Sequence, residues 1–190
     1  QQLMAALRDE GMESVPTPFA ADGVRLKKRG ALIAMQAYRD GWFEIQDEGS
    51  QLVAQLVQAR PGEKGIDFCA GAGGKTLTLS AQMKNRGQIL AWDVAAARLK
   101  QMTPRLARAG VSIVQTRLLK SEQDSHLKKH IESADWVLLD VPCSGTGLWR
   151  RSPDLKRRTT QRDLEKVTEQ QRQITDSAAR LVKPGGRLVY

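Results

Sequence analysis

Two short segments carry residue types that could do chemistry, and the first of them is a glycine-rich loop. Residues 65–76 read GIDFCAGAGGKT, so a short apolar strand with an acid, Asp67, runs into a loop almost without side chains. Such a loop lets a ligand approach main-chain N–H groups, and a helix that begins directly behind it favours negative charge. The segment therefore predicts a site for a nucleotide-like cofactor, although a strand–turn–helix corner whose glycines only ease chain reversal would look the same.

Spacing tests two kinds of cofactor loop. A phosphate-binding P-loop requires G-x-x-x-x-G-K-[ST], and its first glycine would fall at Cys69, where a Cβ atom obstructs the wrap around a phosphate chain. A dinucleotide fingerprint requires G-x-G-x-x-G, and its third glycine would fall at Thr76. Both of these loop types are therefore disfavoured.

An acid further along the chain makes a ribose the better candidate ligand. Residues 88–93 read as a second strand that ends in Asp93, 22 positions after Gly71. An acid about 20 residues past the loop is where such folds grip a ribose diol, because a carboxylate can accept hydrogen bonds from both hydroxyls. A ribose-bearing ligand without a required phosphate grip fits both features, and S-adenosylmethionine is the natural cofactor.

The second chemical segment is a strand that breaks into a turn. Residues 138–147 read LLDVPCSGTG, and Pro142 fixes the backbone between Asp140 and Cys143. A cysteine beside an acid at the carboxyl end of a strand suits covalent catalysis. A small buried cysteine in a tight corner would give the same pattern.

The elements that must position these residues alternate between strand and helix. We expect strands at 65–70, 88–92, 111–115, 134–139 and 186–190, and helices at 75–83, 95–109, 121–131 and 160–182. This alternation predicts an α/β fold with a parallel, doubly wound, Rossmann-like sheet. Ligands bind such sheets at the carboxyl ends of the strands, where Cys69, Asp93 and Asp140 lie. Pro104 predicts a kink or a break in the second helix, and Pro184 with Gly185 is expected to end the last one.

The charge of the chain favours a polyanionic partner. The net charge is +9, and Lys and Arg contacts to phosphates supply most non-specific affinity for nucleic acid. Residues 150–166 hold seven Lys and Arg against three acids, and they begin just after the second motif. Ordinary solvated surface charge is the alternative. We expect a substrate backbone to contact the basic side chains of this stretch, namely Arg150, Arg151, Lys156, Arg157 and Arg158.

Other classes of protein receive little support. No apolar run approaches the ~20 residues of a membrane span, and two distant cysteines suggest no disulfide framework, so a reducing cytoplasm is expected. His126 and His130 have the i,i+4 spacing of a metal pair, but the lysines between them disfavour a cation. We expect a solvated helix face there and no metal site. Nothing indicates an oligomer, so a monomer is the default.

Five motifs together resemble a known family. In chain order they read GWFEIQDEGSQL, DFCAGAGGKT, AWDV, LLDVPCSGTG with WRRSPDLKRR, and LVKPGGRLVY. This order resembles the RNA cytosine-C5 methyltransferases, in the branch of bacterial 16S rRNA cytosine methyltransferase B-like proteins of the Sun/Fmu superfamily. The resemblance implies that residues 41–190 form the methyltransferase catalytic domain, and that residues 1–40 form the end of an N-terminal domain or a linker.

The resemblance also implies an activity and a site. The activity is S-adenosylmethionine-dependent methylation of cytosine C5 in RNA, with rRNA as the first candidate substrate and tRNA as the second. Asp140 would lie between the methionine end of the cofactor and the target cytosine, with Lys75 near the same place. Cys143 would be the family's second cysteine, which assists release of the methylated RNA. The cofactor-binding residues so implied are Cys69, Ala70, Gly71, Ala72, Gly73, Gly74, Lys75, Asp93 and Asp140.

The sequence departs from the family pattern in places. The family's nucleophile is a Thr-Cys a few residues past the Pro-Gly-Gly strand, and the sequence stops at Tyr190 before that position. This polypeptide is therefore expected to bind cofactor without turnover, with strand 186–190 as an exposed edge. Residues 115–117 contain no acid to meet the adenine. Three alternatives stay open: Cys143 as the nucleophile, a non-catalytic RNA-binding module with a vestigial cofactor fold, and a methyltransferase that acts on another substrate.

Overall fold

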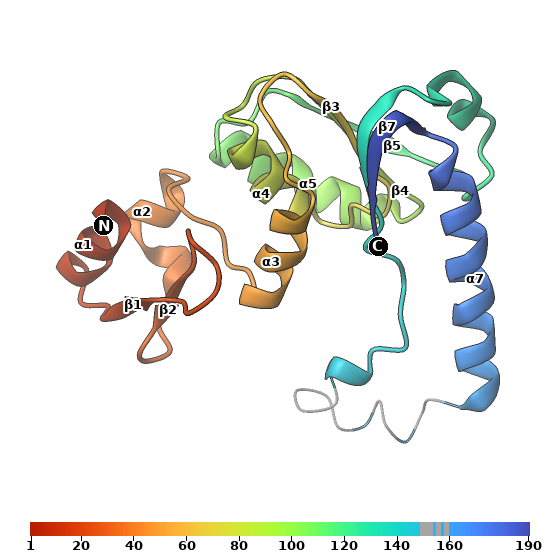
Figure 1. The fold of residues 1–190 in the computed structure, drawn as a ribbon. Coiled ribbons are helices and arrows are strands. Elements are labelled where there is room, and N and C mark those ends of the chain that lie inside the picture. Colours follow the sequence, from red (N-terminus) through yellow and green to blue (C-terminus); the bar gives the residue numbers. More distant parts are fainter. Residues whose placement is uncertain (149–153, 155–156, 158–159) are drawn as a thin grey trace.

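A small N-terminal unit precedes a five-stranded α/β unit in the computed structural model (Figure 1). The structure describes residues 1–148, 154, 157 and 160–190. The N-terminal unit holds an antiparallel pair, β1 and β2, flanked by short helices. Its elements are α1 (Gln2–Asp9), β1 (Ser14–Pro16), β2 (Val24–Leu26), η1 (Leu32–Ala34) and α2 (Gln36–Arg39).

The five strands of the larger unit are all parallel and follow the order β5-β4-β3-β6-β7. Their bounds are β3 (Lys64–Asp67), β4 (Gln88–Asp93), β5 (Val114–Leu118), β6 (Ala134–Leu138) and β7 (Val182–Val189). The chain runs from β3 outward to β5 and then returns to place β6 on the other side of β3. The order therefore reverses at β3, and a crevice for ligands forms at the carboxyl ends of strands at such a point.

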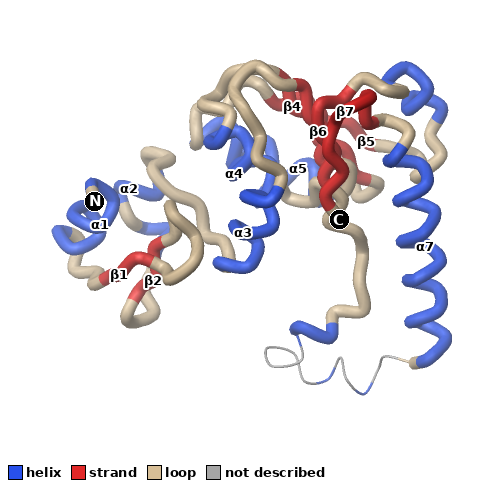
Figure 2. Tube along the Cα trace, in the orientation of Figure 1, coloured by secondary structure: helices blue, strands red, loops and turns tan. Residues whose placement is uncertain are grey.

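Helices cover both faces of the sheet, as Figure 2 shows. One face packs on α3 (Glu48–Leu56), α4 (Gly74–Gln82) and α5 (Ala96–Arg108), and the other on α7 (Gln161–Ala179) and the 3₁₀ helix η2 (Ser125–His130). Successive side chains of β4 alternate between the two faces of the sheet. Ile89 and Ala91 pack on the face covered by α3, α4 and α5, and Leu90 and Trp92 pack on the face covered by α7 and η2. A strand buried on both faces is apolar throughout, which is why 88–93 carries no polar–apolar alternation.

The predicted fold class is confirmed, and β7 lies at an edge of the sheet as expected. Several element boundaries were wrong. The third strand begins at Val114 instead of residue 111, because the Val111 N–H caps α5 at the Leu106 carbonyl and the Ser112 N–H bonds the Asn85 side chain. These two residues are therefore not free to start the ladder.

Three helix predictions also need correction. The segment 121–131 contains only the 3₁₀ turn η2, which the Asp124 side chain caps by accepting from the His126 N–H. Helix α5 continues through Pro104, because that residue lies on the exposed face while Leu99, Met102 and Leu106 hold the helix on the sheet. Helix α7 ends at Ala179, and the Pro-Gly pair lies inside β7 at a register shift in its pairing with β6.

Candidate active site

The loop after β3 adopts a conformation that only glycine takes easily. Gly71 has φ +56° and Gly73 has φ +86°, both in the left-handed region. A Cβ atom added at Gly73 would lie 2.5 Å from Met102 Cγ of α5, so helix and loop are in close contact there. A Cβ added at Gly71 would meet nothing within 4 Å, so this side of the loop is open to a ligand.

Asp93 joins the end of β4 to this loop. Its Oδ2 accepts from the Gly71 N–H at 2.8 Å, and its Oδ1 accepts from the Ala95 N–H at 2.7 Å. The residue is only 7% exposed. The acid predicted from spacing therefore lies against the loop, as a βαβ unit requires. Each carboxylate oxygen has a second acceptor position, which leaves capacity for a ribose hydroxyl.

The two chemical segments meet through one ion pair. Lys75, in the first turn of α4, places its Nζ 2.6 Å from Asp140 Oδ2 beyond the end of β6. The lysine side chain is 14% exposed and the aspartate 53%, so the carboxylate is the accessible member of the pair. The turn that follows is anchored to α7, because Gln171 Nε2 donates to the Pro142 carbonyl at 2.8 Å. Cys143 is exposed beyond this anchor.

The two cysteines differ in chemical environment. Both are free thiols in the structure. Burial, together with the smaller effect of the neighbouring carboxylates, Asp67 first among them, raises the pKa of Cys69 to about 12. A thiol with this pKa stays protonated at neutral pH and is unreactive. Cys69 therefore lines the loop and is not a nucleophile.

Asp67 is a functional candidate to which sequence reasoning gave no role. It is fully buried at the end of β3, and its Oδ2 accepts from the Thr76 hydroxyl at 2.7 Å. Its Oδ1 is buried without a hydrogen-bond partner among the described residues. Burial raises the pKa of Asp67 to about 7, against the opposing effect of the Thr76 hydrogen bond. The available signal was an acid that ends an apolar strand, with a hydroxyl nine residues on in the first turn of the next helix.

The histidine pair is not on a solvated helix face, contrary to expectation. His126 and His130 lie in η2 with their Nε2 atoms 3.1 Å apart, and both rings pack edge-on against Trp92. Burial lowers the pKa of each ring. Both rings thus face the sheet at Trp92 of β4. Among the described residues no group of three or more His, Cys, Asp or Glu side chains could hold a metal ion.

Most of the predicted RNA contacts lie outside the described residues. These are Arg150, Arg151, Lys156 and Arg158. Arg157 is described and is exposed. Along β5, residues 115–117 are exposed and carry no acid, and how the protein would contact an adenine stays untested. Among the described helices, none combines the length and apolar character that crossing a membrane demands.

Comparison with known proteins decides the family. Residues 54–190 match the family described as 16S rRNA methyltransferase RsmB/F. The chain belongs to the RsmB/F family. It is 33% identical over 189 residues to the probable ribosomal RNA small subunit methyltransferase B of Bacillus subtilis, covering 100% of this chain and 42% of that protein. RsmB/F proteins are RNA cytosine methyltransferases that depend on S-adenosylmethionine, so the predicted family and cofactor are confirmed.

Solved structures agree with this assignment. A methyltransferase homolog protein from Pyrococcus horikoshii superposes with a TM-score of 0.83 and 29% identity, covering 99% of this chain and 58% of that one. NSun6 from Pyrococcus horikoshii, solved with SFG, gives a TM-score of 0.75 and 28% identity, covering 87% of this chain and 43% of that one. The chain spans 42% and 38% of the length of its Bacillus subtilis and Synechocystis relatives.

Proposed function

We propose that this RsmB/F chain carries the cofactor-binding and base-contacting part of an enzyme that methylates cytosine C5 in small-subunit rRNA. The Lys75–Asp140 ion pair is the observation that supports this most. It joins the cofactor loop to the Asp-x-Pro-Cys segment at the carboxyl ends of two adjacent parallel strands, β3 and β6. Methyl transfer requires that the methyl donor and the target base lie next to each other, and the carboxyl ends of two adjacent strands provide such a place.

The loop after β3 fits S-adenosylmethionine. Its open side at Gly71 leaves room for the cofactor, and Asp93 lies against the same loop with acceptor capacity for a ribose. The Oδ1 atom of Asp67, which is buried and has no hydrogen-bond partner in the described part of the chain, gives the end of β3 a further acceptor. When bound, S-adenosylmethionine supplies the electrophilic methyl group. No phosphate grip is needed for such a ligand, which agrees with the absence of a P-loop pattern.

The exposed carboxylate of Asp140 is the group that would contact the base. C5 of cytosine is a poor nucleophile until a thiolate adds to C6 and makes C5 enamine-like. Addition of the thiolate places negative charge on the ring, and Asp140 in its acid form would neutralise it by donating a proton at N3. Lys75 would stabilise the Asp140 carboxylate that remains. A base removes the C5 proton, and breaking the S–C6 bond restores the thiolate. The target base must leave its stack to reach this site.

Cys143 is assigned to release of the methylated RNA and not to attack on C6. It is exposed and lies in the turn that Gln171 anchors, close in sequence to the base-contacting acid. The basic stretch 150–166 would hold the RNA backbone, with Arg157 as its described, exposed member. An rRNA substrate would place the protein in the cytoplasm.

Titration calorimetry with S-adenosylmethionine tests the cofactor site. The wild-type chain should bind, and Asp93→Ala should weaken binding at least about tenfold, since a buried charged acceptor contributes at least about 1.5 kcal/mol. Asp135→Ala is the matched control, because Asp135 sits at the amino end of β6, where it accepts from the Lys64 N–H. Absence of binding by the wild-type protein would favour a non-catalytic RNA-binding module.

The reaction is tested in the protein expressed at full length. Bisulfite sequencing of small-subunit rRNA after incubation should show a new 5-methylcytosine, and Asp140→Ala should abolish it. Cys143→Ala should still form a covalent adduct with RNA that contains 5-fluorocytosine. If that variant forms no adduct while it still binds cofactor, Cys143 is the nucleophile and the assignment to product release is wrong.

A further inference from the structure

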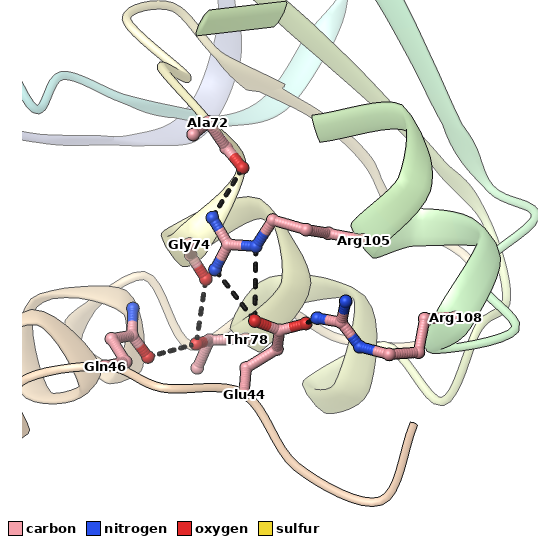
Figure 3. A network of polar contacts seen from close by, with 7 residues as sticks. All are labelled: Glu44, Gln46, Ala72, Gly74, Thr78, Arg105 and Arg108. Atoms are coloured by element: carbon pink, nitrogen blue, oxygen red, sulfur yellow. Dashed lines mark hydrogen bonds and ion pairs between the residues drawn. The ribbon is translucent and has the colours of Figure 1, made fainter. Parts of the chain in front are cut away.

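Helix α5 supports the cofactor loop from behind at two neighbouring points. Met102 and Arg105 are three residues apart and therefore share a face of the helix. Met102 fills the space where Gly73 lacks a side chain, with its Cγ 2.5 Å from the position of an added Cβ. Arg105 Nη1 donates to the Ala72 carbonyl at 2.7 Å (Figure 3).

The contact from Arg105 fixes one particular peptide group. The carbonyl of Ala72 and the N–H of Gly73 belong to the same planar peptide. The carbonyl accepts from Arg105, and the N–H donates to the Ala70 carbonyl at 3.0 Å. This peptide is therefore held at both ends. The preceding turn residue, Gly71, is held separately by Asp93.

Glu44 fixes the orientation of the Arg105 guanidinium. Its Oε2 accepts from Arg105 Nη2 at 3.0 Å and from Nε at 3.2 Å, so two nitrogens face the carboxylate and the third faces the loop. The two side chains are 22% and 17% exposed, and a charge-assisted contact is strengthened by such partial burial. Glu44 comes from the segment before α3, 61 positions from Arg105 in the sequence.

The same segment also holds the other side of the loop. Gln46 Oε1 accepts from the Thr78 hydroxyl at 2.9 Å, and that hydroxyl lies 3.3 Å from the Gly74 carbonyl in the first turn of α4 (Figure 3). Residues 44 and 46 thus contact both helices that flank the cofactor loop. This segment, which is part of the GWFEIQDEGSQL motif, therefore ties α5 to α4 on either side of the loop.

We propose that Arg105 is a positioning residue for the binding of S-adenosylmethionine. Glu44 orients the Arg105 guanidinium, and the guanidinium fixes the Ala72–Gly73 peptide so that the open side of the loop accepts the cofactor. This inference rests on the proposed function, because it takes the loop as the cofactor site. Arg105 would act through the loop and not by touching the cofactor. Its loss should therefore weaken cofactor binding by more than the loss of another arginine of α5 that also pairs with Glu44.

Arg108 is the matched control for this inference. It lies one turn further on α5, pairs with the other oxygen of Glu44, and is similarly covered, at 17% exposed. Its guanidinium lies 4.0 Å from the centre of the Tyr38 ring, away from the loop. Substitution of either arginine removes a contact to Glu44. Only Arg105→Ala also removes the contact to the Ala72 carbonyl.

The test compares dissociation constants for S-adenosylmethionine with thermal midpoints across four proteins: wild type, Arg105→Ala, Arg105→Lys and Arg108→Ala. We expect Arg105→Ala to weaken binding about 10- to 100-fold, as the loss of a charged hydrogen bond does. Arg105→Lys should bind the cofactor more tightly than Arg105→Ala and less tightly than wild type, because a single ammonium group cannot contact both the Ala72 carbonyl and Glu44. Arg108→Ala should lower the thermal midpoint and keep the dissociation constant within about twofold.

The outcomes separate this inference from the proposed function. If the wild-type protein does not bind S-adenosylmethionine, the proposed function fails and the inference fails with it. If the wild type binds and both Arg105 variants bind as tightly, the proposed function stands and the positioning role is wrong. Equal weakening by Arg105→Ala and Arg108→Ala, in step with their thermal midpoints, would also overturn the positioning role. Should Arg105→Ala not fold, Arg105→Lys against Arg108→Lys gives the same comparison.

Discussion

Replacing Asp67 by asparagine should change how the stability of the protein depends on pH. Burial raises the pKa of this carboxyl from its ordinary value of 3.8 to about 7 in the folded state. The folded protein therefore binds the proton more tightly than the unfolded chain does. The free energy of unfolding must then fall as the pH rises from about 4 to about 7, and it levels off above that range.

The size of this effect follows from the shift. Each pKa unit corresponds to about 1.4 kcal/mol, so the ionised carboxylate destabilises the fold by about 4 kcal/mol at high pH. Most of this loss falls inside an accessible window, with about 2.5 kcal/mol between pH 5 and pH 8. Asp67→Asn keeps an oxygen acceptor for the Thr76 hydroxyl but cannot ionise. Any fixed cost of the amide is the same at both pH values and cancels.

Urea unfolding of wild type and Asp67→Asn at pH 5 and pH 8 measures the effect. The stability of the variant relative to wild type should rise by about 2.5 kcal/mol between the two pH values. Thr76→Val is a second variant, because it removes the hydrogen bond that favours the ionised form and should extend the fall in stability above pH 7. A relative stability that stays constant from pH 5 to pH 8 would show that Asp67 has no raised pKa.

Three further predictions concern the backbone and the histidine pair. Gly73→Ala should lower the free energy of unfolding in urea by at least about 2 kcal/mol, since it adds backbone strain in the left-handed region and a clash with α5. Gly71→Ala, which has open space around it, should lower it only by the strain of about 1–2 kcal/mol. Pro104→Ala should raise the free energy of unfolding by about 1–3 kcal/mol, because α5 is continuous there and gains a hydrogen bond; an unchanged value would mean that the proline is not a defect. Because burial lowers the pKa values of His126 and His130, stability should fall as the pH drops through the ordinary histidine range, and a double substitution to glutamine should flatten that fall in thermal melts from pH 7.5 to 5.

Much of the fold could be predicted because its signals are local or pass between neighbouring elements. The alternation of strands and helices gives a parallel sheet, and right-handed crossovers make β3 and β4 neighbours. This is why the spacing from Gly71 to Asp93 was enough to place the acid on the loop. Boundaries were less certain, since whether Val111 extends a strand or caps α5 depends on where the Leu106 carbonyl lies.

The sequence by itself predicted the family, through the order of its motifs, and it placed the glycine-rich loop and the acids at the strand ends, because glycine conformation and strand period are properties of the local chain. Only the tertiary structure showed that Lys75 and Asp140, 65 positions apart, form the link between the two motifs. It alone showed that Glu44 orients Arg105 against the loop. An ion pair between distant segments has no period and no fixed spacing, so its geometry is known only once the fold has brought the partners together. The raised pKa of Asp67 has the same origin, since desolvation depends on what packs around a group and not on its neighbours in the sequence.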